Sequence, residues 1–185
     1  MDTLANINRR GLDISITLNL SGQSLTDKNL AEFVHEQLQR SGVAPEKICF
    51  ELTETAAISN LDNADYFIRS AKKLGCKFAL DDFGSGLSSF AYIKHFPVDY
   101  LKIDGSFVRD IIHDPTDKVM VSAINQMAHV LGMKTIAEFV ENDEILRELQ
   151  VIGVDMVQGF GIGRPEPFVS RLTGKLPQEN FKNAA

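Results

Sequence analysis

The chain has 185 residues, which favours a single domain, and its 44% hydrophobic and 24% charged residues are typical of a soluble globular protein. The net charge of −6 argues against broad binding to polymeric nucleic acid, but not against a small anionic ligand held through metal ions. We expect a cytoplasmic domain without membrane contact, because no apolar run could span a bilayer, Met1–Arg10 is unlike a signal peptide, and Cys49 and Cys76 are typical of buried thiols in a reducing compartment.

Six apolar, strand-like runs alternate with amphipathic helical patterns along the chain. The first predicted helix carries Leu30, Phe33, Val34 and Leu38 on one face, and the later ones span Asp62–Leu74, Lys118–Leu131 and Asp143–Val151. The predicted strands are Ile14–Leu20, Ile48–Leu52, Phe78–Asp82, Asp99–Asp104, Thr135–Phe139 and Met156–Phe160. Strands that alternate with helices of this length indicate parallel pairing and an α/β fold.

Cap residues support the predicted boundaries of the helices. Glycine, which adopts a left-handed backbone at little cost, follows four of the helical patterns, as Gly42, Gly75, Gly132 and Gly153. Side chains that suit an N-cap precede four helices, as Thr26, Asn60, Thr116 and Asn142.

Each predicted strand carries a polar residue at or near its carboxyl end. In chain order these residues are Asn19, Glu51, the pair Asp81 and Asp82, Lys102, Glu138, and Gln158. Six strands would fit an open doubly wound sheet or most of a (β/α)8 barrel. In either case the carboxyl ends of parallel strands share one face, so these residues should converge on one site, as in the active site of a barrel enzyme.

The converging side chains favour a divalent metal site. One strand-end glutamate alone is more often a salt bridge or a helix cap, and Lys102 alone could pair with Asp104. Several carboxylates in close contact cannot all stay ionised without a cation. The predicted ligands offer only oxygen atoms, which suits Mg²⁺ or Mn²⁺, and adjacent aspartates suit two ions about 3.5–4 Å apart, as in phosphodiester hydrolysis. Lys102 and Gln158 would then orient water or steady charge on a phosphate.

Two short motifs carry less weight. Asp82-Phe83-Gly84 matches the metal motif of protein kinases, but no catalytic loop precedes it. Gly159-Phe160-Gly161-Ile162-Gly163 looks like a dinucleotide loop, yet Pro165 and Pro167 follow it instead of a helix. A metal-dependent aldolase-like or enolase-like barrel would leave Asn19 and Gln158 unexplained.

Six motifs, in this order and spacing, resemble the EAL family of cyclic-di-GMP phosphodiesterases. They are Asn19-Leu20-Ser21, Glu51-Leu52-Thr53-Glu54, Asp81-Asp82-Phe83-Gly84-Ser85-Gly86, Leu101-Lys102-Ile103-Asp104, Ala137-Glu138-Phe139-Val140-Glu141 and Gln158-Gly159. The resemblance covers residues 12–168 and implies a modified TIM barrel that hydrolyses cyclic-di-GMP to pGpG.

The resemblance also implies roles for the matching residues. Two Mg²⁺ or Mn²⁺ ions would be bound by Asn19, Glu51, Asp81, Asp82 and Glu138. Lys102 would lie near the nucleophilic water, Gln158 would support the site, and Lys102, Glu138 and Gln158 form the expected catalytic set. Glu54 would anchor the loop Phe83–Ala91, in which Gly84, Ser85 and Gly86 would contact the substrate. The family often forms homodimers near this loop.

The sequence departs from the family pattern at two places. No Glu-Ala-Leu tripeptide occurs, so we expect six of eight barrel strands in a partial domain over residues 1–173, two strands missing before Met1, and a loose tail at 174–185. The missing glutamate is a metal ligand in the family, so weak or no hydrolysis is expected from the chain alone, and a non-hydrolytic cyclic-di-GMP receptor is the alternative. Phe139 replaces the more usual Gly, and on a strand its side chain would point away from Glu138.

Overall fold

A computed structural model describes residues 14–84 and 93–166 and shows one parallel β-sheet. The six strands lie in chain order and each pairs in parallel with the next. They are β1 (Ile16–Leu20), β2 (Ile48–Thr53), β3 (Lys77–Phe83), β4 (Tyr100–Ile103), β5 (Lys134–Ala137) and β6 (Met156–Val157). Within the described ranges β1 and β6 are the two edges, so the predicted α/β fold with six strands of an incomplete barrel is confirmed.

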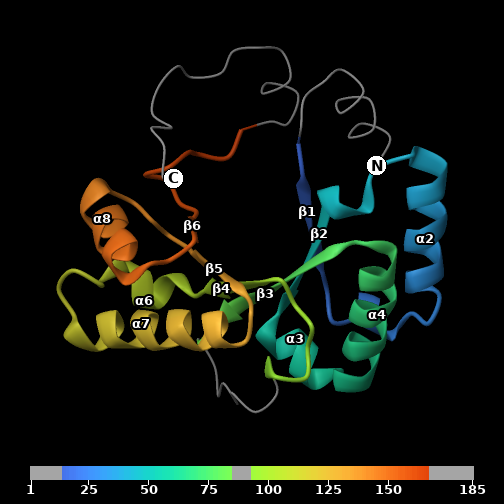
Figure 1. Ribbon diagram of the computed structural model, residues 1–185, viewed down its shortest axis with the longest axis horizontal. Helices are drawn as coiled ribbons and strands as arrows, with labels where there is room; N and C mark the ends of the chain where they lie inside the picture. Colours follow the sequence, from blue (N-terminus) through green and yellow to red (C-terminus); the bar gives the residue numbers. More distant parts are fainter. Residues whose placement is uncertain (1–13, 85–92, 167–185) are drawn as a thin grey trace.

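The helices cover the outside of the sheet (Figure 1). The four long ones are α2 (Leu30–Ser41), α4 (Leu61–Leu74), α7 (Pro115–Val130) and α8 (Asp143–Ile152), each close to its predicted range. Short elements that were not predicted are α3 (Glu54–Ser59), α6 (Gly105–Arg109) and two 3₁₀ turns, η1 (Ser24–Thr26) and η2 (Pro45–Lys47). The strands follow an arc inside these helices, so the carboxyl ends of β1 to β6 lie along one rim (Figure 1).

The glycine boundaries are confirmed. The four glycines all have positive φ angles of 66°, 103°, 77° and 87°, at Gly42, Gly75, Gly132 and Gly153. Asn60 and Asn142 precede α4 and α8 as predicted, and the Asn142 side chain accepts hydrogen bonds from the backbone N–H groups of Glu144 and Ile145 at 3.0 and 2.9 Å.

Two predicted N-caps were wrong. Thr26 ends the turn η1, and Asn29 occupies the cap position of α2. Thr116 lies inside the first turn of α7, whose cap is Asp114, because Pro115 takes the first helical position and Asp114 accepts a hydrogen bond from the Thr116 N–H at 2.7 Å.

The core lies between the sheet and the helices and contains an aromatic cluster. The rings of Phe50 on β2, Phe67 on α4 and Phe78 on β3 have centroids 5.4 to 5.7 Å apart. The prediction of buried thiols is confirmed for Cys76, while Cys49 is half-buried. Burial raises the pKa of the Cys49 thiol to about 12 and of the Cys76 thiol to about 11.

The last two predicted strands were too long. β5 ends at Ala137, and Phe139 has a φ of 54°, so it is not on a strand. β6 contains only Met156 and Val157, and the exposed Phe160 lies beyond it. The predicted strands were too long because the apolar sequence runs extend beyond the hydrogen-bonded strands. The residues after each strand end either pack at the carboxyl rim or protrude from it.

A polar clamp fastens the amino ends of β5 and β6 to α7. The Asp155 carboxylate accepts hydrogen bonds from the backbone N–H and hydroxyl of Thr135 at 2.8 and 3.1 Å, and it lies 2.8 Å from Nε2 of His129. The buried Asn125 joins the clamp through its Oδ1, 2.5 Å from the Thr135 hydroxyl. Burial acts to raise the pKa of Asp155, but the hydrogen bonds from Thr135 and His129 outweigh it and hold that pKa below its usual value.

We expect Asp155→Ala to lower the free energy of unfolding by about 1–3 kcal/mol, because it leaves a buried N–H of Thr135 without a partner. A carboxyl with a lowered folded-state pKa stabilises above its unfolded pKa and loses that contribution as the pH falls through the folded value. The difference between wild type and variant should therefore shrink below about pH 4. Urea unfolding at several pH values measures it, and Asp65→Ala, which breaks the exposed pair with Arg69, should cost under about 0.5 kcal/mol.

Candidate active site

The carboxyl rim of the sheet brings together a cluster of charged side chains around Lys102. The Lys102 Nζ lies 2.7 Å from Asp81 Oδ1, 2.9 Å from Glu138 Oε1 and 3.4 Å from Glu51 Oε2. These four residues come from β4, from β3, from the residue after β5, and from β2. Residues up to 87 positions apart in the sequence therefore meet through the parallel register, as the strand-end pattern predicted.

A bulge in β3 turns both aspartates toward the same side. Successive residues of a regular strand point to opposite faces. Here the pairing of β3 with β4 shifts register between Leu80 and Phe83, and Asp82 has a φ of 55°. The Asp82 N–H donates to Asp81 Oδ1 at 3.1 Å, which fixes the turn. As a result Asp81, Asp82 and Glu138 each offer a carboxylate oxygen, and these atoms lie within 4.8 Å of one another.

The crowding of carboxylates shifts their proton equilibria. Burial raises the pKa of Glu138 and of Glu51, and in both cases Lys102 offsets part of the effect while Asp81 adds to it. Burial, followed by the charges of Asp81 and Asp104, raises the pKa of Asp82. The cluster holds four carboxylates, from Glu51, Asp81, Asp82 and Glu138, and one ammonium, from Lys102. It therefore carries an excess of negative charge at a partly desolvated site.

Lys102 stays charged within the cluster. Its side chain is only 4% exposed, and burial acts to lower the pKa of the ammonium. The hydrogen bonds and charges of Asp81 and Glu138 outweigh burial and raise that pKa above its usual value. The suggestion that Lys102 alone could pair with Asp104 does not hold, because Asp104 instead caps α6 and accepts from the Ser106 N–H at 2.7 Å.

Asn19 and Gln158 lie at the two ends of the same rim. Asn19 is paired in register with Glu51, and its side chain is exposed on the edge strand β1. Gln158 is exposed, and its backbone N–H donates to the Ala137 carbonyl at 2.8 Å, next to Glu138. The structure thus gathers Glu51, Asp81, Asp82, Lys102 and Glu138 closely and leaves Asn19 and Gln158 at the margins.

Glu54 lies beneath the beginning of the loop that follows β3. It is a buried residue in the first turn of α3, and its Oε2 accepts from the Gly84 N–H at 3.4 Å. Gly84 has a φ of 99°, in the left-handed region that glycine adopts readily. Ser85 and Gly86 lie outside the described residues.

Two features of the rim were missed in the sequence. Asp104 was considered only as a partner of Lys102 and as part of a motif, but its charge also helps to raise the pKa of Asp82. Phe139 packs on Gly105 and on Arg109, whose guanidinium carbon lies 4.1 Å from the ring centroid. The predicted strand through Phe139 hid this contact, because it placed the ring on the opposite face.

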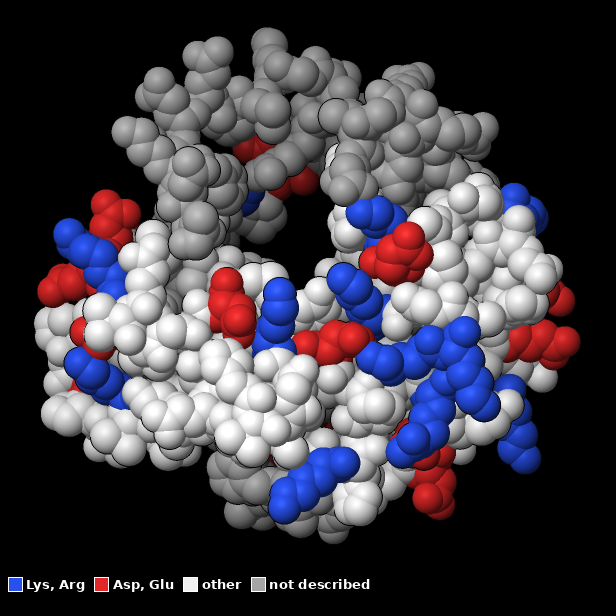
Figure 2. Space-filling model, in the orientation of Figure 1, with Lys and Arg blue, Asp and Glu red and all other residues white. Residues whose placement is uncertain are grey.

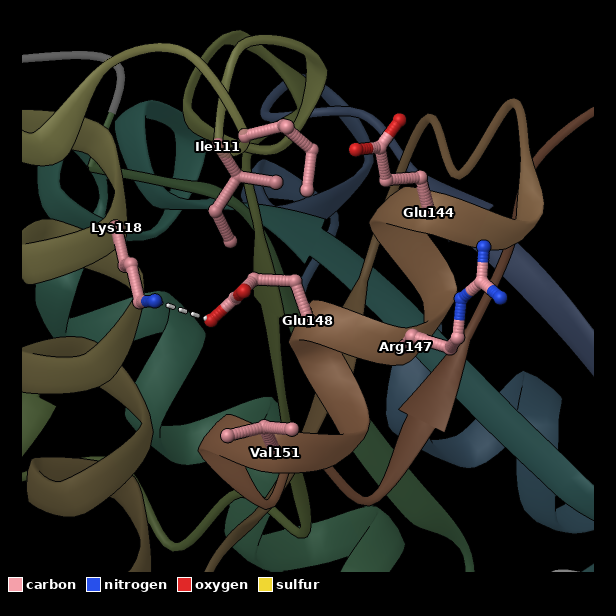
Figure 3. A pocket seen from close by; sticks show the side chains of 7 residues that line it. Ile111, Lys118, Glu144, Arg147, Glu148 and Val151 are labelled. Atoms are coloured by element: carbon pink, nitrogen blue, oxygen red, sulfur yellow. Dashed lines mark ion pairs between the residues drawn. The ribbon is translucent and has the colours of Figure 1, made fainter.

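Charged side chains lie along the lower, described border of the opening seen in Figure 2. A separate surface pocket of about 360 Å³ lies between α7 and α8, away from the carboxylate cluster. In Figure 3 Lys118 reaches across this pocket to Glu148, and their charged atoms are 2.6 Å apart. Its lining is completed by the charged Glu144 and Arg147 and the apolar Ile111, Ile112 and Val151. Lys118 and Glu148 neutralise each other, so this pocket lacks the excess negative charge found at the carboxyl rim.

The donor set of the rim fits a hard divalent cation. Its carboxylate oxygens are the ligands that Mg²⁺ and Mn²⁺ prefer, and no sulfur or imidazole ligand joins them within the described ranges. The positive φ of Asp82 adds to this reading, because a strained aspartate that brings a carboxylate toward two others is stable only when the surroundings compensate.

Among the described residues, none of the helices is long and apolar enough to cross a bilayer.

Comparisons with known proteins agree with this geometry. The cyclic di-GMP phosphodiesterase PdeB of Shewanella oneidensis is 45% identical over 158 residues, which cover 85% of this chain and 18% of PdeB. A solved structure described as "PaMucR Phosphodiesterase, c-di-GMP complex" matches with a TM-score of 0.83 and 32% identity over 92% of this chain and 71% of the other. The EAL domain of Mycobacterium smegmatis DcpA matches with a TM-score of 0.86 and 28% identity over 93% and 78%.

The chain spans less than a quarter of the length of the curated relatives PdeB and the phosphodiesterase PdeA of Borreliella burgdorferi, at 18% and 24%. Within this chain, however, the EAL domain model matches residues 1–165. The six motifs, the parallel sheet and the carboxylate rim fall inside that match, and the chain belongs to the EAL domain family.

Proposed function

We propose that this chain takes part in the divalent-metal-dependent hydrolysis of cyclic di-GMP to linear pGpG. The observation that carries the proposal is the buried Lys102, held within 3.4 Å of Asp81, Glu138 and Glu51 at the carboxyl rim. The names of the relatives support the substrate, since PdeB is a cyclic di-GMP phosphodiesterase and the PaMucR structure is a complex with that ligand.

We infer that two Mg²⁺ or Mn²⁺ ions are bound by Asn19, Glu51, Asp81, Asp82 and Glu138. The close group of Asp81, Asp82 and Glu138 supports this most directly. Glu51 joins through its contact with Lys102, and Asn19 lies beside Glu51 in the sheet register. Bound divalent ions supply Lewis acidity at a phosphodiester oxygen and favour ionisation of a nearby water.

Lys102 and Glu138 are the side chains best placed to act on the reacting groups. The Lys102 ammonium, fixed by two carboxylates, can donate a hydrogen bond to a water at the rim and can stabilise negative charge that develops on the phosphate. The raised pKa of Glu138 makes its carboxylate a better proton acceptor than an exposed glutamate. Gln158, the residue after β6, would hold the water or phosphate from the open side.

Glu54 is proposed as the anchor of the substrate loop. Its buried carboxylate accepts a hydrogen bond from the N–H of Gly84, the last described residue at the start of that loop. Gly84 would then begin the substrate contacts that the sequence also assigns to Ser85 and Gly86.

The expected partners follow from the same site. The ligand is a small cyclic dinucleotide and not polymeric nucleic acid, in line with the net charge of −6. A homodimer is supported by an apolar hollow of about 310 Å³, lined by Ile93, Lys94, Met127, Val130 and Leu131, next to the substrate loop in the sequence. The two free thiols fit a cytoplasmic location.

A receptor that binds cyclic di-GMP without hydrolysis is the second candidate function. Asn19, one of the proposed ligands, is exposed on the edge strand β1. A site with fewer ligands could hold the phosphate through one cation and Lys102 without activating water.

The test is an assay of cyclic di-GMP hydrolysis by the purified chain, with pGpG measured by chromatography. Because the family's glutamate ligand is missing from this chain, we expect at most weak pGpG formation in Mn²⁺ or Mg²⁺, and none in a chelator. A parallel titration in Ca²⁺, which is expected to suppress turnover, measures binding. Binding in Ca²⁺ without pGpG in Mn²⁺ would favour the receptor, and neither binding nor pGpG would contradict both functions.

A further inference from the structure

Phe139 adopts a backbone conformation that an aromatic residue rarely takes. Its φ of 54° lies in the left-handed region, where a β-carbon crowds the following carbonyl group. The neighbouring hydrogen bonds impose this conformation. The Glu138 N–H donates to the Ile103 carbonyl at 3.3 Å, and the Val140 N–H donates to the Gln158 carbonyl at 3.1 Å. The chain on both sides of Phe139 is therefore fixed.

Burial does not explain a phenylalanine at this position. The side chain is 45% exposed, so a large part of the ring is in contact with water. Glycine would relieve the backbone strain at once, because it adopts positive φ freely. A strained and exposed aromatic residue that directly follows a cluster carboxylate is a reason to look for a function.

The ring is held in place from two sides. The guanidinium carbon of Arg109 lies 4.1 Å from the ring centroid, which is a cation–π arrangement. The ring also rests on Gly105, where an added β-carbon would come within 2.6 Å of the Phe139 Cγ. Gly105 begins α6 two residues after the end of β4, the strand that carries Lys102, so the ring lies at the carboxyl rim.

We propose that Phe139 is a stacking platform for a purine base of the cyclic dinucleotide. The inference rests on the proposed function, because it assumes that the phosphodiester binds at the carboxylate cluster. Glu138 contacts Lys102 in that cluster, and the next residue presents an aromatic face fixed by Arg109. Stacking needs a ring in a set orientation, and a base has a π-face whatever its hydrogen-bonding groups. Phe139 thus binds the base while the cluster binds the phosphate.

The absence of tryptophan from the chain allows a direct test. Phe139→Trp introduces a single indole at the platform, and Phe33→Trp introduces one on the outer face of α2, at a side chain that is 57% exposed. We expect cyclic di-GMP in Ca²⁺ to quench the emission of the Phe139→Trp variant and to leave that of the Phe33→Trp variant unchanged. Equal responses from the two variants would overturn the proposal.

Affinity gives the second measurement. In Ca²⁺, Phe139→Leu should bind cyclic di-GMP about 5- to 150-fold more weakly than wild type, while Phe139→Trp stays within about threefold. Phe139→Gly should also bind weakly although it melts no earlier, because glycine suits the positive φ. Wild-type affinity in the leucine and glycine variants would overturn the platform and leave the proposed function intact. If the wild type did not bind cyclic di-GMP in Ca²⁺, the proposed function itself would be overturned, and the inference about Phe139 with it.

Discussion

The Asp81→Asn variant should hydrolyse cyclic di-GMP at least about 10²-fold more slowly than wild type, because the amide removes one preorganised charge from the active site. Asp81 makes the shortest contact with Lys102, at 2.7 Å between Oδ1 and Nζ. It also belongs to the close group of carboxylates that Asp82 and Glu138 complete. The amide keeps the size of the side chain but cannot neutralise a cation or hold the ammonium as an ion pair. Chromatography of pGpG at saturating Mn²⁺ measures the rate.

Glu148→Gln is the matched control for Asp81→Asn. It makes the same carboxylate-to-amide change in the pocket between α7 and α8, where Glu148 pairs with Lys118. We expect its rate to stay within about twofold of wild type, as for a partly exposed ion pair that takes no part in the reaction. If Asp81→Asn were as active as Glu148→Gln, the carboxylate rim would not be the site of hydrolysis.

Lys102→Met should destabilise the metal-free chain by about 3–5 kcal/mol, the cost typical of removing one partner from a buried ionic group. Methionine fills the space of the lysine stem but leaves Glu51, Asp81 and Glu138 facing one another without a cation. Mn²⁺ should recover part of the loss, because an ion that binds only the folded state stabilises it by mass action. Urea unfolding in chelator and in Mn²⁺ measures both effects.

Lys72→Met serves as the control for this loss of charge. Lys72 lies 2.7 Å from Asp99, but both side chains are about 30% exposed, so this variant should lose under about 1 kcal/mol and gain nothing from Mn²⁺. If Lys102→Met were destabilised equally in chelator and in Mn²⁺, the cluster would be a structural ion-pair network and not a metal site.

Much of the site could be predicted from where polar residues interrupt apolar strands. Glu51, Lys102 and Glu138 come from three segments, and the rule that parallel strands end on one face brings them together. The boundaries of α4 and α8 were equally clear, since Asn142 caps α8 and the glycines that follow both helices adopt the left-handed backbone.

The departures from regular structure could not be predicted from the same rules. Strict alternation would place Asp81 and Asp82 on opposite faces, and only the register shift between β3 and β4 brings both to the rim. The predicted strand was extended to Phe139 because the same alternation rule was applied beyond its true end, although β5 ends two residues earlier, at Ala137. Such bends depend on hydrogen bonds to distant strands, for example from Val140 to Gln158, which no local pattern contains.

The contact between Phe139 and Gly105 restricts the order in which these two positions can change during evolution. Any larger residue at position 105 would overlap the phenylalanine ring, as shown by the 2.6 Å approach of an added β-carbon to its Cγ. Position 139 can lose its ring first, since glycine there relieves the backbone. A chain that keeps the aromatic residue therefore requires glycine at 105, whereas a chain that has lost the ring could accept a larger side chain there.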